Sequence, residues 1–376
     1  MSDDRTRRVY EDLGVRPVIN AAGSLTMLGG SRLSPGVREA MDAANRYFVD
    51  MKTLLKESGK VIAGMMGCEA AMVTPGCASA LSLGAAACMT GKDIEKLEQL
   101  PDTIGMKHNF LVQSLQRYKY DRCMTIFGGR IEEVGDKQGT TASQLEASID
   151  ENTAAVLCVA PGDREGVVPI KEVISIATNK NVPVIVDAAS EVYPHERMRR
   201  YTDMGADIVG FGAKYFGSCN STGLMCGRKE LVDAAFLHSF ISFETEGHRA
   251  VGRPMKVDRQ EVIATVTALR EWIEMDHDAR FAEADKRTRL IQDGLTEVKH
   301  IEVIPVTEER GLGNGLNIRV DEGSLGKTIP QIIEELHQGD PDIWVWYGKS
   351  NLSVAVHPLT EEDAVIVRDR LREVLG

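Results

Sequence analysis

The sequence lacks a cysteine pair at C-x-x-C spacing. Its seven cysteines stand singly, at Cys68, Cys77, Cys88, Cys123, Cys158, Cys219 and Cys226. A disulfide framework or a zinc site needs regular, paired ligands, and the dispersed histidines also show no metal-ligand spacing. We therefore expect reduced thiols, no metal and a cytoplasmic location.

Positive charge and long apolar runs are also scarce. There are 44 Lys and Arg against 56 Asp and Glu, which gives a net charge of −12. Nucleic-acid binding needs a basic surface, so we expect no nucleic-acid partner. The most apolar stretch, residues 78–90, is too short to cross a bilayer, and the charged first residues do not form a secretory signal. We therefore expect no membrane partner.

Strands and helices alternate between residues 69 and about 251. This alternation predicts an α/β fold with a large, mostly parallel, seven-stranded sheet and helices on both faces. The direction of the last strand stays open, and a helix is expected near residues 118–127. The predicted strands are Ala70–Thr74, Phe110–Gln113, Arg130–Val134, Ala154–Val159, Val182–Val186, Ile208–Phe211 and Thr222–Cys226.

The rest of the chain has other patterns. Residues 256–296 show helical spacing and high charge, and short strands with two helices follow from residue 301. We predict four segments: an N-terminal arm with helices (1–67), a large domain (68–255), connecting helices (256–300) and a small C-terminal α+β domain (301–376).

Two polar side chains follow buried strands. Asp187 ends the run VPVIVD, and Lys214 follows the run DIVGFGA. Ligands of open α/β sheets bind at the carboxyl ends of strands, and an acid with an amine there suits pyridoxal 5'-phosphate. Each residue also has an ordinary explanation: lone lysines are mostly surface residues, and a strand-terminal Asp can cap a helix or bind Mg²⁺.

A third feature is the turn Thr74-Pro75-Gly76-Cys77-Ala78, which opens a helix of small residues. Backbone N–H groups at a helix N-terminus bind phosphate, although small-residue helices also simply pack closely. The order of this turn, Asp187 and Lys214 along the chain favours a pyridoxal-phosphate site. The small residues after Asp187 leave room beside the cofactor, and Ser190 is a candidate hydrogen-bond donor there.

At this point the chain resembles the fold-type I pyridoxal-phosphate enzymes. Within them it is similar to the group of selenocysteine synthase (L-seryl-tRNA selenium transferase) and D-glucosaminate-6-phosphate ammonia-lyase. The resemblance implies an aminotransferase-like fold. It rests on LGVRPVINAAGSLTMLGG, EAAMVTPGCASALSLGAAACMTG, PDTIGMKHNFLVQS, VPVIVDAASEVYP, GAKYFGSCNSTGLMCGRKEL and GRPMKVDRQEV.

The resemblance also implies roles for individual residues. Lys214 would form the Schiff base, Asp187 would pair with the pyridine nitrogen, and Ser190 would lie near the ring oxygen or the phosphate. The phosphate would be held by Gly76, Cys77 and Ala78. Sites of this family are shared across a dimer, so we expect a homodimer or a higher even-numbered homo-oligomer, with Thr222 and Gly223 near the neighbouring subunit's cofactor. Substrate contacts are implied for Asn20, Arg253 and Lys256.

Two positions depart from the family pattern. Relatives often have a His-Arg pair where this chain has Gln116-Arg117, so Gln116 takes the place of a histidine that stacks on the cofactor ring. Relatives also often have a serine three residues before the lysine, where this chain has Phe211.

The resemblance to the ammonia-lyase branch implies the activity of a lyase. A carbanion next to a hydroxyl-bearing carbon loses that hydroxyl, so a small hydroxylated amino acid or amino-sugar acid would give a 2-keto acid and ammonia. An amino-acid racemase or epimerase is the alternative enzyme, and a ligand-binding α/β protein is the alternative outside catalysis. The resemblance does not imply a tRNA substrate, because the selenium transferase carries a separate N-terminal tRNA-binding domain and here only about 35 residues precede the first core helices.

Overall fold

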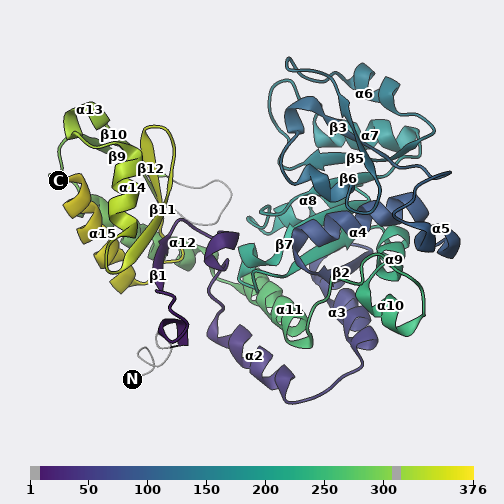
Figure 1. Ribbon diagram of the computed structural model, residues 1–376, viewed down its shortest axis with the longest axis horizontal. Helices are drawn as coiled ribbons and strands as arrows, with labels where there is room; N and C mark the ends of the chain where they lie inside the picture. Colours follow the sequence, from purple (N-terminus) through teal and green to yellow (C-terminus); the bar gives the residue numbers. More distant parts are fainter. Residues whose placement is uncertain (1–8, 307–314) are drawn as a thin grey trace. The chain divides into compact units, whose positions relative to one another are not determined.

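The computed structural model describes residues 9–306 and 315–376. These residues form two compact units (Figure 1). The large unit is Arg32–Glu274, and the small unit joins the residues up to Ser31 to Met275–Gly376. The predicted boundaries at residues 67, 255 and 300 stay predictions.

The large unit is built on a sheet in which the described strands have the order β2-β8-β7-β6-β5-β3-β4. β8 runs antiparallel to both of its neighbours, and the other pairs are parallel. The predicted mostly parallel, seven-stranded sheet is confirmed, and the strand whose direction was open is antiparallel. The strands are β2 (Ala70–Thr74), β3 (Asn109–Gln113), β4 (Arg130–Val134), β5 (Thr153–Val159), β6 (Val184–Asp187), β7 (Ile208–Gly212) and β8 (Gly223–Gly227).

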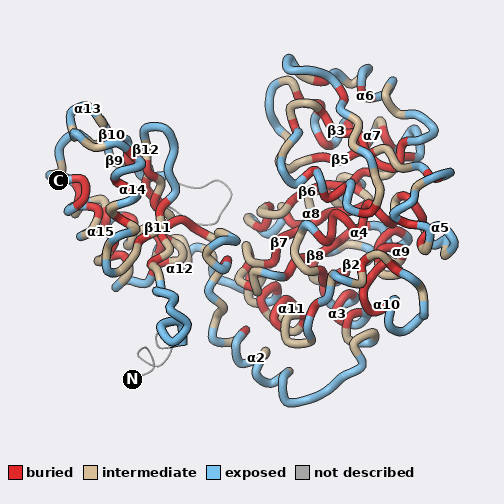
Figure 2. The backbone as a smooth tube through the Cα atoms, in the orientation of Figure 1, coloured by how far each residue is buried: buried red, intermediate tan, exposed pale blue. Residues whose placement is uncertain are grey.

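The helix α4 (Gly76–Thr90) packs against strands β5 to β8, and its residues are mostly buried (Figure 2). Its Ala, Gly and Ser side chains allow this close approach: a Cβ on Gly84 would lie 3.1 Å from the Ile208 side chain. The other helices of this unit are α2 (Pro35–Asn45), α3 (Met51–Met66), α5 (Ile94–Gln99), α6 (Ala142–Ser148), α7 (Ile170–Asn179), α8 (Glu196–Asp203), α9 (Lys229–Leu237), α10 (Phe240–Thr245) and α11 (Arg259–Glu274).

The prediction of a helix near residues 118–127 is wrong. The chain there forms a loop and a short 3-10 helix, Asp121–Met124. The buried carboxylate of Asp121 explains this, because it accepts hydrogen bonds from the Arg117 side chain (2.6 Å) and the Tyr118 backbone N–H (3.3 Å). A side chain that binds backbone and neighbouring donors in this way competes with helix formation.

The small unit contains a second sheet, of order β1-β11-β12-β10-β9 among its described strands. β1 comes from the N-terminal arm and pairs in parallel with β11, and the other pairs are antiparallel. The elements are β1 (Val18–Ala21), α12 (His277–Gly294), β9 (Ile301–Val306), β10 (Gly315–Val320), α13 (Glu322–Leu325), α14 (Ile329–His337), β11 (Asp342–Tyr347), β12 (Asn351–Ala355) and α15 (Glu361–Leu375). None of the described helices has the length and hydropathy needed to cross a membrane.

Candidate active site

Four strand ends lie together at the carboxyl end of the parallel strands of the large sheet. In the sheet register Thr74, the last residue of β2, pairs with Gly223, which pairs with Gly212 at the end of β7. Asp187, the last residue of β6, pairs with Gly210. Because β8 is antiparallel to both neighbours, its first residue lies where their last residues lie. The segments before and after these strands therefore share one site.

The Asp187 carboxylate is buried at this edge, with 8% of the residue exposed. Three groups donate hydrogen bonds to it: the Tyr118 hydroxyl, the Ala189 backbone N–H (3.0 Å) and the Cys77 thiol (3.5 Å). A buried carboxylate needs such partners, because burial without them is costly. The site thus presents a fixed negative charge at the end of a strand.

Burial and the nearby Asp187 charge raise the pKa of two of these donors. The pKa of the Tyr118 hydroxyl rises for both reasons, and so does the pKa of the Cys77 thiol. Desolvation and a neighbouring negative charge both disfavour the anionic forms. Both groups therefore keep their protons and act as donors to Asp187.

Lys214 lies in the 3-10 helix Ala213–Phe216, directly after β7, and is half-buried. Its Nζ atom is 5.1 Å from the centre of the Tyr215 ring. Burial lowers the pKa of Lys214, because desolvation disfavours the ammonium form. A lowered pKa increases the fraction of neutral, nucleophilic amine. This lysine is thus suited to covalent chemistry.

The start of α4 lies beside the first residue of β8. Gly76 has φ = +77°, a conformation that favours glycine, and none of the described side chains caps the start of this helix. A Cβ on Gly223 would lie 2.4 Å from the Gly76 carbonyl carbon and 2.6 Å from the Cys77 nitrogen. The uncapped N–H groups at residues 76–78 can therefore bind an anion.

Thr222 links this loop to the lysine turn. The Ala213 N–H donates to the Thr222 carbonyl oxygen over 3.0 Å. The Thr222 hydroxyl is buried and donates to the Cys219 carbonyl oxygen (3.0 Å). Ser190 is half-buried and lies three residues after Asp187. Thr222 and Gly223 thus contact this chain's own site, and their predicted reach to a neighbouring subunit stays a prediction.

Gln116 contacts the end of β5. Its side-chain amide donates to the Val159 carbonyl oxygen and accepts from the Val159 N–H, each over 3.2 Å. Val159 pairs with Asp187 in the sheet, so Gln116 is close to the site. Its amide is occupied by this backbone pair, and its role on the cofactor ring stays a prediction.

The three predicted substrate residues have other contacts in the structure. The Arg253 side chain forms an ion pair with Glu244 of α10. Lys256 is exposed after the same loop. Asn20, in the small unit, closes a turn by donating to the Gly23 carbonyl oxygen (2.8 Å) and accepting from the Ala22 N–H (2.9 Å). Their substrate contacts stay predictions.

Sequence reasoning missed Tyr118 and Tyr215. Tyr118 binds Asp187, and its ring centre is 5.8 Å from that of Tyr120 in an edge-to-face contact. The pKa of Tyr215 is raised by burial, with smaller contributions from Tyr120 and Asp187. The available signal was the Tyr118-Lys119-Tyr120 run just after Gln116-Arg117, and the tyrosine next to Lys214.

Comparison with known proteins agrees with this geometry. The family model for aminotransferase class-V matches residues 128–325. A 5'-C-glycyluridine monooxygenase-decarboxylase from Streptomyces is 30% identical over 97% of this chain and 92% of its own length. The chain belongs to the aminotransferase class-V family. The expected resemblance to fold-type I pyridoxal-phosphate enzymes is confirmed.

Two further comparisons concern D-glucosaminate-6-phosphate ammonia-lyase. The D-glucosaminate-6-phosphate ammonia lyase of Salmonella typhimurium is 27% identical over 98% of both chains. A solved structure of D-glucosaminate-6-phosphate ammonia-lyase matches 98% of both chains with a TM-score of 0.85 and 25% identity. This class-V chain is an enzyme, and its cofactor is pyridoxal 5'-phosphate.

The residues of this class-V enzyme fit that cofactor. An aldehyde needs a partly desolvated amine, a pyridine nitrogen needs a buried carboxylate, and a phosphate needs free N–H groups. Lys214, Asp187 and the uncapped start of α4 supply these at one edge of the sheet. The Asp187 carboxylate, to which the Tyr118 hydroxyl donates, would be the partner of the pyridine nitrogen.

Proposed function

We propose that this enzyme is a pyridoxal-phosphate-dependent lyase. It removes the β-hydroxyl and the amino group of a small hydroxylated amino acid or amino-sugar acid, and forms a 2-keto acid and ammonia. The observation that carries the proposal is the match to D-glucosaminate-6-phosphate ammonia-lyase over 98% of both chains, at a TM-score of 0.85. The acid, amine and anion-binding loop at the sheet edge support it.

The cofactor, when bound, supplies an aldehyde for the substrate amine and an electron sink that acidifies the hydrogen on the neighbouring carbon. The Asp187 carboxylate would pair with the pyridine nitrogen and stabilise its protonated form. The N–H groups of residues 76–78 would hold the phosphate, and Ser190 would donate a hydrogen bond to the ring oxygen or the phosphate.

Lys214 carries the proton in this proposal. Its lowered pKa lets the free amine accept the α-proton of the substrate at Nζ. The β-hydroxyl then leaves as water after it takes a proton. The Lys214 ammonium formed in this way supplies that proton, which returns Lys214 to the free amine. The elimination product is released as an enamine, which rearranges to an imine. Water hydrolyses the imine to the 2-keto acid and ammonia.

Product analysis tests the proposal. The enzyme is incubated in deuterated water with D- and L-serine, D- and L-threonine, D-glucosaminate and D-glucosaminate 6-phosphate. We expect equal amounts of keto acid and ammonia from at least one of them, and neither with Lys214→Ala. Exchange of the α-hydrogen with inversion, without ammonia, contradicts the lyase and supports a racemase or epimerase.

The Streptomyces relative favours a second candidate. Its name describes a monooxygenase-decarboxylase of 5'-C-glycyluridine, and it is 30% identical over 380 aligned residues. The same reaction on this chain would consume O₂ and release CO₂ from an amino acid attached to a nucleoside. An oxygen electrode and trapping of CO₂ distinguish it from the lyase, which consumes no O₂.

We propose further that the enzyme is a cytoplasmic homodimer or a higher even-numbered homo-oligomer. In the assembly Thr222 and Gly223 would also approach the neighbouring cofactor, and Asn20, Arg253 and Lys256 would contact the substrate. Sedimentation velocity tests the assembly, and a monomer that retains full activity contradicts it. Substitution of Arg253 by Gln should raise the KM for an anionic substrate and leave kcat nearly unchanged.

A further inference from the structure

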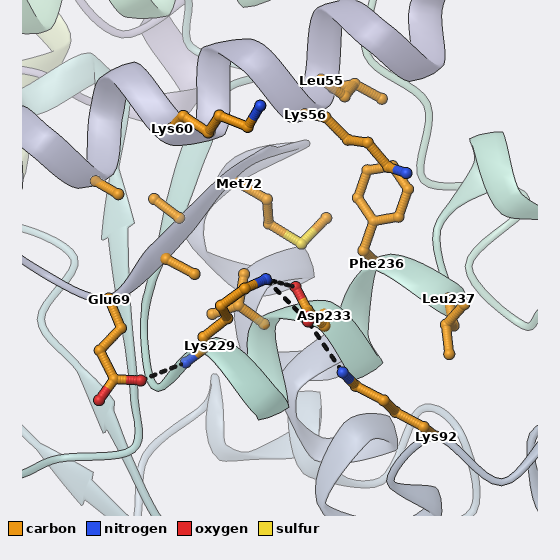
Figure 3. A pocket seen from close by; sticks show the side chains of 15 residues that line it. Leu55, Lys56, Lys60, Glu69, Met72, Lys92, Lys229, Asp233, Phe236 and Leu237 are labelled. Atoms are coloured by element: carbon orange, nitrogen blue, oxygen red, sulfur yellow. Dashed lines mark hydrogen bonds and ion pairs between the residues drawn. The ribbon is translucent and has the colours of Figure 1, made fainter.

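A cavity lies against the edge strand β2, between α3 and α9 (Figure 3). Its volume is about 490 Å³, which is the size of a small-molecule pocket. β2 contributes Ala70, Ala71 and Met72 to it. The anion-binding loop of the active site follows the other end of this strand, after Thr74. The cavity is therefore separate from the site at the strand ends.

The floor of the cavity is apolar. Leu55 from α3, Met72 from β2 and Val232 from α9 are each less than 5% exposed. The wall between α3 and β2 is tightly packed, because a Cβ on Gly59 would lie 2.3 Å from the Ala71 carbonyl oxygen. A rigid apolar floor favours the apolar body of a ligand.

The rim of the cavity is basic. It carries four lysines, Lys56, Lys60, Lys92 and Lys229, and two acids, Glu69 and Asp233. Asp233 pairs with Lys229 (2.8 Å) and with Lys92 (2.9 Å), as Figure 3 shows. This leaves an excess of positive charge on the lining of one cavity in a protein of net charge −12.

Lys56 and Lys60 lie one helical turn apart on α3. The Lys56 ammonium is 5.6 Å from the centre of the Phe236 ring, on the opposite wall. The Lys60 ammonium pairs with Glu57 over 2.6 Å at an exposed place, where such pairs contribute little. Both ammonium groups can therefore turn toward an anion in the cavity.

We propose that this cavity binds a small organic anion with an apolar body, such as an aryl or acyl sulfonate, carboxylate or phosphate. The apolar body lies on the floor, and the anionic group meets the ammonium groups of Lys56 and Lys60. Both halves of the lining contribute to binding: a neutral ligand gains nothing from the lysines, and a bare inorganic anion leaves the floor in water.

Calorimetric titration of the holoenzyme with 8-anilinonaphthalene-1-sulfonate tests the proposal. The double variant Lys56→Ala/Lys60→Ala should weaken binding on the order of tenfold, because two exposed charge contacts are lost. The matched control Lys171→Ala/Lys180→Ala has the same change in charge on exposed residues outside the cavity, and should bind as the parent does. The neutral analogue N-phenyl-1-naphthylamine should bind both doubles equally.

Three results would overturn the proposal. In the first, the parent binds no sulfonate. In the second, both double variants bind it as tightly as the parent does, and in the third, both lose the same affinity relative to the parent. The oligomeric state is measured by sedimentation velocity on the same samples. If only the Lys56/Lys60 variant dissociates and the assembled parent binds no sulfonate, a second copy of the chain covers the cavity and the small-ligand proposal is wrong.

Discussion

Replacement of Gly223 by alanine should damage the anion-binding loop without removing any chemical group. The added Cβ would lie 2.4 Å from the Gly76 carbonyl carbon, 2.6 Å from the Cys77 nitrogen and 2.6 Å from the Phe211 carbonyl oxygen. Ordinary contacts start near 3.4 Å, so backbone on two sides must move by almost 1 Å. Overpacking of this kind costs about 1–3 kcal/mol, and here the neighbours are backbone atoms, which cannot change rotamer.

Thermal unfolding of the cofactor-free protein and titration with pyridoxal phosphate measure the two effects. We expect the Tm of Gly223→Ala to fall by roughly 1–4 °C for a chain of this size. We expect weaker cofactor binding as well, because the loop that moves carries the N–H groups of residues 76–78.

Gly64→Ala is the matched control. Gly64 lies on α3, is exposed, and has no atom within 4 Å of an added Cβ. Alanine there should raise stability by up to about 1 kcal/mol and leave cofactor affinity unchanged. If Gly223→Ala unfolds and binds the cofactor as the parent does, the close approach of β8 to the loop is wrong.

Three other substitutions or reagents test the surroundings of the site. Tyr118→Phe removes one donor to the buried Asp187 carboxylate and should cost the cofactor-free protein about 1.5–3 kcal/mol in urea unfolding. Burial lowers the pKa of His238 to about 4, below its value near 6.5 in the unfolded chain. The free energy of unfolding therefore has its full value from this group above pH 6.5 and loses it as the pH falls toward 4. At pH 5 the loss in free energy of unfolding from this group is about 2 kcal/mol. The variant His238→Gln should reduce the loss of stability between pH 7 and pH 5 by that amount. Burial and Asp187 keep the Cys77 thiol protonated, so Cys77 should react with iodoacetamide at pH 8 much more slowly than a free thiol, as peptide mass spectrometry measures.

Each of these has a clear contrary result. Tyr118→Phe with parental stability means that the hydroxyl does not support Asp187, and Tyr120→Phe, at an exposed ring, is its control. An unchanged pH dependence in His238→Gln means that other groups set the acid sensitivity. Rapid alkylation of Cys77 in the folded holoenzyme means that the site is more open than its burial indicates.

The order of an anion-binding turn, an acid and an amine along the chain favoured pyridoxal 5'-phosphate, and the comparisons confirm that cofactor. Short buried strands that end in Asp187 and just before Lys214 place an acid and an amine at one sheet edge, because parallel strands end on the same side. The glycine turn before α4 added the anion site. The seven-stranded sheet followed from the alternation of strands and helices, since local patterns set the period of each element.

Tertiary structure decided the neighbours of these groups. The Tyr118 hydroxyl contacts Asp187 because hydrogen bonds to the Asp121 carboxylate hold the loop that carries Tyr118. No local pattern encodes a contact between residues 69 positions apart. The Gln116 amide bonds to Val159, which only the packing of β5 beside β6 makes possible.

The sequence by itself thus predicted the fold class, and it indicated the cofactor and the acid, amine and loop that are proposed to hold it. These depend on residue type and on the order of strands, both of which are local. Only the tertiary structure decided that β8 is antiparallel, that Gly223 abuts residues 76 and 77, and that four lysines surround an apolar cavity beside β2. Those features depend on distances between segments far apart along the chain, which burial and packing set after the local elements have formed.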